Sequence, residues 1–175
     1  MEFDQDNKVV QLCAKGMDME GQGRLTEAVD RFNEAWSAAT NDFEKFTAAH
    51  YVARHQKNIH DKLKWDETAL KHALNINDKT IKEMLPSLYL NIGKCYEDLD
   101  DLDNAKNNYQ AAFSYISFLP DNGYGNMIRA GITNGLNELN KKLTFDSIRM
   151  DHFTPDTFPQ LVHACQCQKL FQISG

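Results

Sequence analysis

The chain has 175 residues, with 19 basic and 25 acidic side chains, a formal net charge of −6 and an apolar content of 42%. These values are typical of one soluble globular domain, and they give no electrostatic reason to expect a nucleic acid or an anionic membrane as a partner. No apolar run approaches the roughly 18–20 residues that a membrane-spanning helix needs. The acidic first residues, MEFDQDNK, are unlike a secretory signal, so we expect a cytoplasmic protein.

The four cysteines are Cys13, Cys95, Cys165 and Cys167. Cys13 and Cys95 fall inside patterns of helical period, where a free cysteine behaves as a small apolar residue. Since a chain of this length does not need covalent staples, we expect all four thiols to be reduced.

Three segments align without gaps: Leu12–Trp36, His50–Leu74 and Tyr89–Phe113, with starts spaced by 38 and then 39 residues. Each segment holds two stretches with apolar residues at helical spacing, separated by a short polar turn. A further 38 residues lead to Met127, which opens a fourth, incomplete segment. The pattern predicts an all-α fold built from stacked helix pairs.

The first segment has its large and small apolar residues at Leu12, Gly16, Met19, Ala28, Phe32 and Ala35. In the third segment the corresponding residues are Tyr89, Gly93, Tyr96, Ala105, Tyr109 and Ala112. This series resembles the tetratricopeptide repeat, a helix–turn–helix unit. The resemblance implies a right-handed solenoid of helical hairpins, with three full repeats, a partial fourth and a C-terminal capping segment.

Small residues at the crossing of two helices let their axes approach closely. We therefore expect Gly16 to face Ala28, and Gly93 to face Ala105. The second segment departs from this pattern, because its crossing positions become Arg54 and Asp66. Either these two residues form an ion pair, or the alignment slips in this segment.

The resemblance implies a concave groove lined by the first helix of each repeat. The residues that it places there are Cys13, Met17 and Glu20 in the first repeat, Tyr51, His55 and Asn58 in the second, Leu90, Asn91, Lys94 and Glu97 in the third, and Ile128 and Ile132 in the fourth. This mixed lining suits a short helix or an extended peptide with apolar anchors. In the alternative interpretation, several of these positions pack against the C-terminal tail.

One subfamily of these repeats clamps a C-terminal carboxylate with lysine, asparagine and arginine side chains. The matching positions here are Cys13, Met17, Val52, Ser87 and Asn91. None of them is cationic, although such a clamp depends on charged donors that converge on one anion. We therefore predict that the chain does not bind acidic C-termini.

Composition changes near residue 143, so we divide the chain into a repeat domain, 1–142, and a tail, 143–175. Apolar residues at helical spacing predict an amphipathic helix at about 159–170. The tail is either loosely ordered, or its helix caps the solenoid or docks into the groove of its own chain or of a neighbour. The last possibility makes a self-associating structural protein, and thus a homodimer, the alternative function.

Signals for metal or catalytic chemistry are weak. The run His163-x-Cys165-x-Cys167 has no second cluster to complete a zinc site. The five carboxylates between Glu97 and Asp103 lack the glycine of a calcium loop. Neither a phosphate-binding glycine loop nor a nucleophile motif is present. We expect no metal, no cofactor and no catalytic residue.

The leading hypothesis is a cytoplasmic scaffold that binds a protein or peptide in its concave groove, and that binds neither nucleic acid nor membrane. A third hypothesis is a small-molecule or catalytic role that uses His50, His55 and Asn58.

Overall fold

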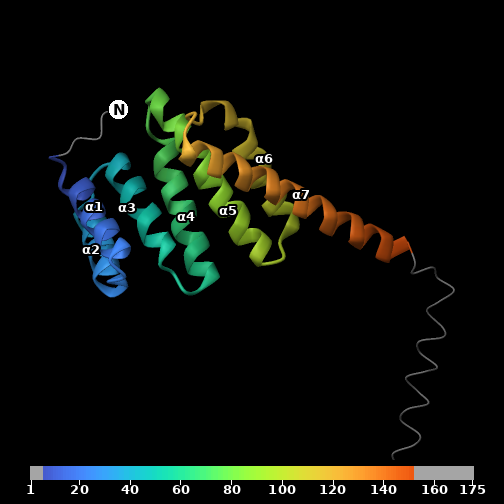
Figure 1. Cartoon of the computed structure of the whole chain (residues 1–175), viewed down its shortest axis with the longest axis horizontal. Helices are drawn as coiled ribbons and strands as arrows, with labels where there is room; N and C mark the ends of the chain where they lie inside the picture. The colour runs from blue at the N-terminus through green and yellow to red at the C-terminus, as the bar shows by residue number, and fades with distance from the viewer. Residues whose placement is uncertain (1–5, 152–175) are drawn as a thin grey trace, which may run out of the picture. The chain divides into compact units, whose positions relative to one another are not determined.

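The computed structural model describes the backbone of residues 6–151 and the side chains of residues 6–144. The chain divides into two compact units, Met1–Leu139 and Asn140–Gly175. The helices are α1 (Lys8–Gly21), α2 (Leu25–Ala38), α3 (Asp42–Arg54), α4 (Ile59–Leu74), α5 (Leu85–Asp98), α6 (Leu102–Ser114) and α7 (Gly123–Asp151), with 3₁₀ turns η1 (Lys79–Glu83) and η2 (Ile116–Phe118) (Figure 1).

Residues 6–151 contain helices and turns but no strand, as the repeat pattern predicted. None of their helices combines the length and the apolar character needed to cross a bilayer. The predicted helix at 159–170 lies outside the described residues, and the boundary at residue 142 stays a prediction.

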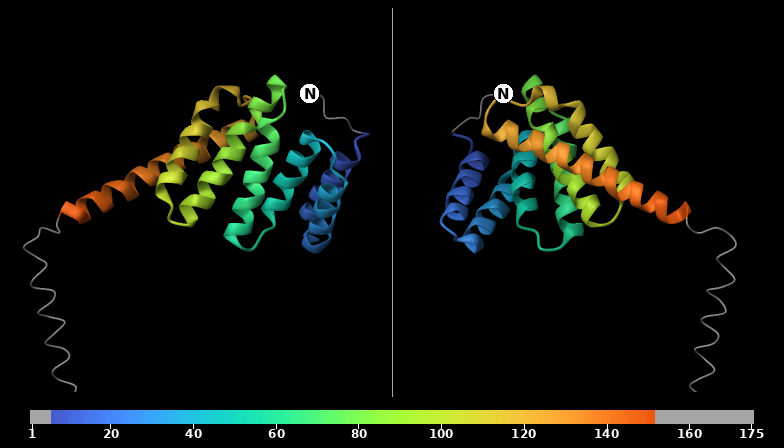
Figure 2. Two further views of the ribbon diagram at one scale, coloured as in Figure 1. Left: turned by 180° about the vertical axis from the view of Figure 1, so that it is seen from behind. Right: turned by 45° about the vertical axis from the view of Figure 1, so that its right-hand side comes forward.

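Within the first unit, α1 pairs with α2, α3 with α4, and α5 with α6, and each pair packs on the next (Figures 1 and 2). Asparagine side chains cap three of these helices. The Oδ1 atom of Asn7 accepts hydrogen bonds from the first turn of α1, and Asn41 and Asn58 do the same for α3 and α4. These hairpins confirm the predicted helical-hairpin solenoid.

Glycines allow close packing in the first and third pairs, but against different partners than predicted. A methyl group on Gly16 would meet the ring of Phe32. A methyl group on Gly93 would lie 2.7 Å from the ring of Tyr109. Ala28 and Ala105 are buried in the same pairs but are not the closest neighbours. The glycines therefore make room for an aromatic ring.

We expect Gly93→Ala to lower the free energy of unfolding by about 1–3 kcal/mol, because the added methyl group overpacks the site. The ring of Tyr109 cannot retreat, since Gly135 of α7 contacts it as well and its hydroxyl is bonded to Glu97 at 2.7 Å. The matched control is Gly21→Ala, where no atom lies within 4 Å of the new methyl group. Urea unfolding of both variants tests this prediction, and equal stability of the two would contradict it.

The second pair shows that the predicted alignment slipped by four residues. Helices α1, α3 and α5 begin at residues 8, 42 and 85, and Gly16, His50 and Gly93 each lie eight positions further on. Sixteen residues after these three positions lie Phe32, Asp66 and Tyr109, each in the second helix of its pair, and all three are buried.

The repeat spacings are therefore 34 and 43 residues, instead of 38 and 39. Arg54 does not pair with Asp66; it is exposed and bonds to Glu20 at 3.0 Å. Most of the additional residues in the second spacing lie after α4, in the segment 75–84. This segment includes η1, and its Ile81 is buried with Leu85 and Leu88.

The start of α7 packs on the third pair as the first helix of a partial fourth repeat. Ile128 and Ile132 are buried with Ala112, and Gly131 lies against Leu90. Arg129 fixes the preceding turn, because its guanidinium donates to the carbonyl of Leu119 at 2.8 Å.

Candidate functional site: a pocket between the first helices

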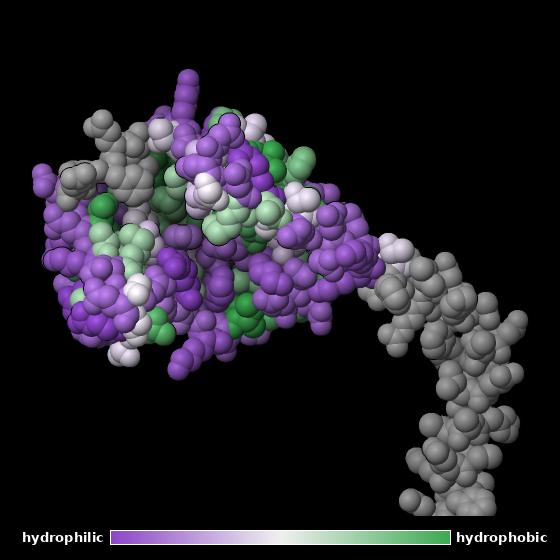
Figure 3. Space-filling model, viewed as in Figure 1, coloured by the Kyte–Doolittle hydropathy of each residue, from purple (hydrophilic) through white to green (hydrophobic). Residues whose placement is uncertain are grey.

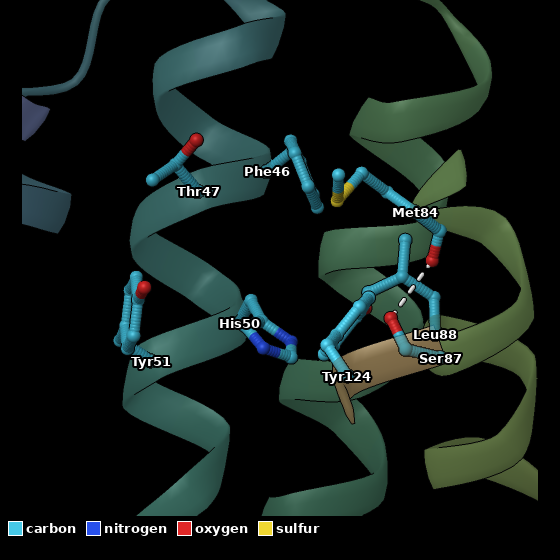
Figure 4. Close-up of a pocket in the computed structure, with 8 residues that line it drawn as sticks. All are labelled: Phe46, Thr47, His50, Tyr51, Met84, Ser87, Leu88 and Tyr124. Atoms are coloured by element: carbon cyan, nitrogen blue, oxygen red, sulfur yellow. Dashed lines mark hydrogen bonds between the residues drawn. The ribbon is translucent and has the colours of Figure 1, made fainter. Parts of the chain in front are cut away.

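A pocket of about 180 Å³ lies between α3, the start of α5 and one side chain of α7. Figure 4 shows its lining, which consists of Phe46, Thr47, His50, Tyr51, Met84, Ser87, Leu88 and Tyr124. The pocket therefore combines residues from three repeats on the side of the molecule that the first helices form.

Helical spacing explains how α3 supplies half of this lining. Phe46 and His50, four residues apart, share one side of the helix, and Thr47 and Tyr51 share the adjacent side. Phe46 packs in a core cluster with Leu88, and Met84 packs against that cluster. The wall of the pocket is thus mainly apolar.

Two polar side chains of the lining are satisfied by their own helices. The hydroxyl of Thr47 donates to the carbonyl of Phe43 at 2.8 Å, and that of Ser87 donates to the carbonyl of Met84 at 2.9 Å. Neither hydroxyl needs to give its proton to a partner molecule.

The imidazole of His50 differs from these hydroxyls. Its ring extends from α3 into the space between α3 and α5 (Figure 4), and its buried Nδ1 atom has no hydrogen-bond partner in the part of the chain that the structure describes. Burial lowers the pKa of His50 to about 4, and the positive charges of Arg54 and Lys62 act in the same direction. His50 is therefore neutral at pH 7.

An ion pair within α4 faces α5; its carboxylate is buried and its ammonium group is partly exposed. Lys62 Nζ is 2.6 Å from Asp66 Oδ2, and the carboxylate side chain is only 1% exposed. Burial raises the pKa of Asp66, while Lys62 opposes this shift. Burial also raises the pKa of the neighbouring Cys95 thiol to about 11, so this thiol is protonated and unreactive.

Some of the predicted groove residues on α1 and near the end of α3 are partly or fully exposed: Met17, Glu20, Tyr51 and His55. Met17 is 40% exposed, and Tyr51 is half-buried with its ring stacked on Phe32. Glu20 Oε1 lies 3.1 Å from His55 Nε2 and also bonds to Arg54. These side chains present apolar, acidic and basic groups close together.

The predicted residues of α5 have mainly structural contacts. Lys94 is 57% exposed and pairs with Glu97 at 3.3 Å and Asp98 at 3.0 Å. Glu97 is buried and accepts the hydroxyl proton of Tyr109, and burial together with this hydrogen bond raises the pKa of Tyr109. Asn91 is half-buried near Asp66, and its amide side chain acts to lower the pKa of that carboxyl group.

Besides the buried Glu97, four predicted groove residues present little side chain to a partner. Cys13 is 2% exposed because it packs between helix pairs, and Ile128 and Ile132 are buried where α7 meets the third pair. Leu90 is half-buried against Gly131. Burial in the hydrophobic core is the physical reason in each case.

Asn58 lies away from the pocket. It caps α4, and together with His55 it lines a separate, open depression of about 860 Å³ between α2 and α4. The structure thus does not bring His50, His55 and Asn58 together as one site.

Several pocket residues were absent from the predicted groove: Phe46, Thr47, His50, Met84, Ser87, Leu88 and Tyr124. The four-residue slip displaced those on α3. A sequence signal for the correct register exists, since Asn41 followed by acidic Asp42 and Glu44 is a helix start. Tyr124 had no local signal, because only the packing of α7 brings it to the pocket.

The face of the molecule that Figure 3 shows is mainly hydrophilic, with hydrophobic side chains in separate patches. Among the residues that the structure describes, no group of three or more histidine, cysteine or acidic side chains could hold a metal ion.

No family model matches the sequence, and no curated protein matches it. Among solved structures, the first tetratricopeptide repeat domain of Spaghetti (RPAP3), bound to the HSP90 peptide SRMEEVD, is similar with a TM-score of 0.54 and 20% sequence identity. The similarity covers 78% of this chain and 94% of that one. Together with the three helical hairpins, it shows that the chain has the fold of the tetratricopeptide repeat proteins.

Proposed function

We propose that the chain is a cytoplasmic protein-interaction scaffold that binds a peptide or a helix on the face formed by α1, α3, α5 and the start of α7. The pocket between α3 and α5 carries this proposal, because it is a concave, mainly apolar site with few polar groups, as binding sites generally are. The structurally similar domain of RPAP3 holds a peptide, which supports the same kind of partner here.

The partner is not expected to be an acidic C-terminus. The corrected register replaces Val52 by Ala48 in the set of clamp positions, so that the set becomes Cys13, Met17, Ala48, Ser87 and Asn91. None of these residues is cationic, and Cys13 and Ala48 are buried. The peptide SRMEEVD has three carboxylate side chains, for which these positions offer no matching positive charge.

We expect the double variant Met17→Glu/Tyr124→Glu to capture partner proteins at least about tenfold less than the wild type. Both side chains are exposed on the proposed binding face, and a carboxylate in an apolar contact must lose its hydration. Quantitative mass spectrometry of proteins retained from a cell extract measures the change.

The matched control is Leu25→Glu/Phe113→Glu, which adds the same charges at exposed apolar positions on α2 and α6. Circular dichroism must show that both variants are folded. If the control loses the same proteins, or if the first variant keeps them all, the proposed binding face is wrong.

A further inference from the structure

We propose that a depression beside η1 is a second docking surface, which takes a partner segment that carries an apolar side chain next to a carboxylate. The depression lies where η1 and η2 run side by side (Figures 1 and 2). It shares no lining residue with the pocket between α3 and α5, so it goes beyond the binding face proposed above.

The floor of this depression is apolar. Its volume is about 300 Å³, and it is bounded by the end of α4, by η1 and by the residue that follows α6. Ile81 and Leu85 are buried in its floor, and Ile76 and Tyr115 are half-buried there. Since an apolar cavity of about 150 Å³ accommodates benzene, the depression has room for a large apolar side chain.

The additional residues of the second repeat spacing build most of this surface. The majority of the lining residues belong to the segment 75–84, which lengthens that spacing to 43 residues, against 34 for the first. Ile81 of this segment joins the core, whereas Asn77, Lys79 and Lys82 stay exposed. The segment therefore connects two helix pairs and also presents side chains to solvent.

Two large apolar side chains at the surface adjoin the depression. Leu74 lines it and is 53% exposed. Phe118 is 41% exposed, and its ring centre lies 5.0 Å from Nζ of Lys82 on the rim. Apolar surface that gathers around a depression is typical of an interaction site.

The rim of the depression is basic, although the whole chain has a net charge of −6. Lys79 and Lys82 are three residues apart in a 3₁₀ turn, where such residues project on the same side. Neither ammonium group has an acidic partner within the part of the chain that the structure describes. The acidic residue of the lining, Asp78, accepts hydrogen bonds from the amide and the hydroxyl of Thr80, each at 2.8 Å.

These charges select which apolar segment fits. A carboxylate next to the inserted apolar side chain would lie near two ammonium groups, and the contact with Phe118 holds that of Lys82 at the edge of the depression. A lysine or arginine in the same place would be repelled. Because the lysines are exposed, salt must weaken the attraction.

The test uses three tetrapeptides with acetylated and amidated ends: ELFE, its neutral analogue QLFQ and its basic analogue KLFK. Each is titrated into the full chain at pH 7 and followed by ¹H–¹⁵N spectra. We expect ELFE to shift the resonances of Ile76, Ile81 and Tyr115, and to bind at least about fivefold tighter than QLFQ in about 20 mM salt but not in about 0.5 M salt. Absence of ELFE binding, equal binding of the three peptides, or shifts confined to the pocket between α3 and α5 overturns the proposal.

The variant Lys79→Gln/Lys82→Gln removes both charges, and we expect it to bind ELFE no more tightly than QLFQ. Lys64→Gln/Lys106→Gln is the matched control at exposed lysines of α4 and α6, and should retain the preference of the wild type. Leu74→Gln removes the apolar contact and should weaken ELFE and QLFQ alike. All five positions are exposed, so these variants are expected to fold. A preference for ELFE that survives the loss of Lys79 and Lys82 overturns the proposal.

A second copy of the chain is the other candidate occupant, and sedimentation equilibrium distinguishes it. A dimer that Leu74→Gln dissociates would assign the depression to self-association and overturn the acidic partner. Failure of the peptides to bind at the depression leaves the binding face of α1, α3 and α5 as proposed, because Met17 and Tyr124 lie outside the depression.

Discussion

Replacing Lys62 by methionine is expected to lower the free energy of unfolding by about 3–5 kcal/mol at pH 7. Asp66 is buried and its carboxylate is 2.6 Å from the ammonium group of Lys62. Without that cation, the buried side chain of Asp66 either stays as an unpaired carboxylate or takes up a proton at an energetic cost. Urea unfolding at pH 7 measures the change.

The double variant Lys62→Met/Asp66→Leu is expected to lie close to the wild type, because replacing both members of a buried ion pair by apolar residues is often neutral or stabilising. The difference between the single and the double variant isolates the cost of the unpaired carboxylate. If both variants lose the same stability, the ion pair is not the reason for the effect.

Lowering the pH from about 6.5 to about 4 is expected to destabilise the wild type by up to about 3 kcal/mol more than His50→Gln. Burial lowers the folded-state pKa of His50 to about 4, with Arg54 and Lys62 adding to the shift, while the unfolded value is about 6.5. Between these values the unfolded chain binds the proton more readily. The stability that depends on a neutral His50 is therefore fully present above about pH 6.5 and is lost as the pH falls toward 4.

The comparison with His50→Gln removes the contribution of carboxyl groups that titrate over the same range. Thermal or urea unfolding of both chains at several pH values gives the two stability curves. Parallel curves would show that His50 does not have the depressed pKa, and a two-dimensional NMR titration of its ring gives the same answer directly.

The first and third repeats were predictable because their packing follows a local rule. In each, a glycine lies sixteen residues before an aromatic residue, Gly16 before Phe32 and Gly93 before Tyr109, and the ring fills the space above the glycine. The spacing of small and large apolar residues predicted both hairpins and the all-helical fold, although it placed an alanine, not the aromatic ring, opposite each glycine.

The second repeat was placed incorrectly because it distributes large and small side chains in the opposite way. The large side chain, His50, occupies the position of the glycine, and the shorter Asp66 occupies the position of the aromatic residue. An alignment that seeks small residues and aromatic rings in fixed places finds neither there. Packing requires only that the two volumes together fill the space between the helices.

The order of amino acids by itself determined the helices and their arrangement in hairpins, since these depend on apolar periodicity and on contacts between helices that are neighbours in sequence. Only the tertiary structure decided which side chains are accessible. Cys13 and Ile132 share the helical pattern of groove residues but are buried by neighbouring pairs, whereas Tyr124 reaches the pocket because α7 packs there. Exposure depends on helices distant in sequence, and no local pattern records it.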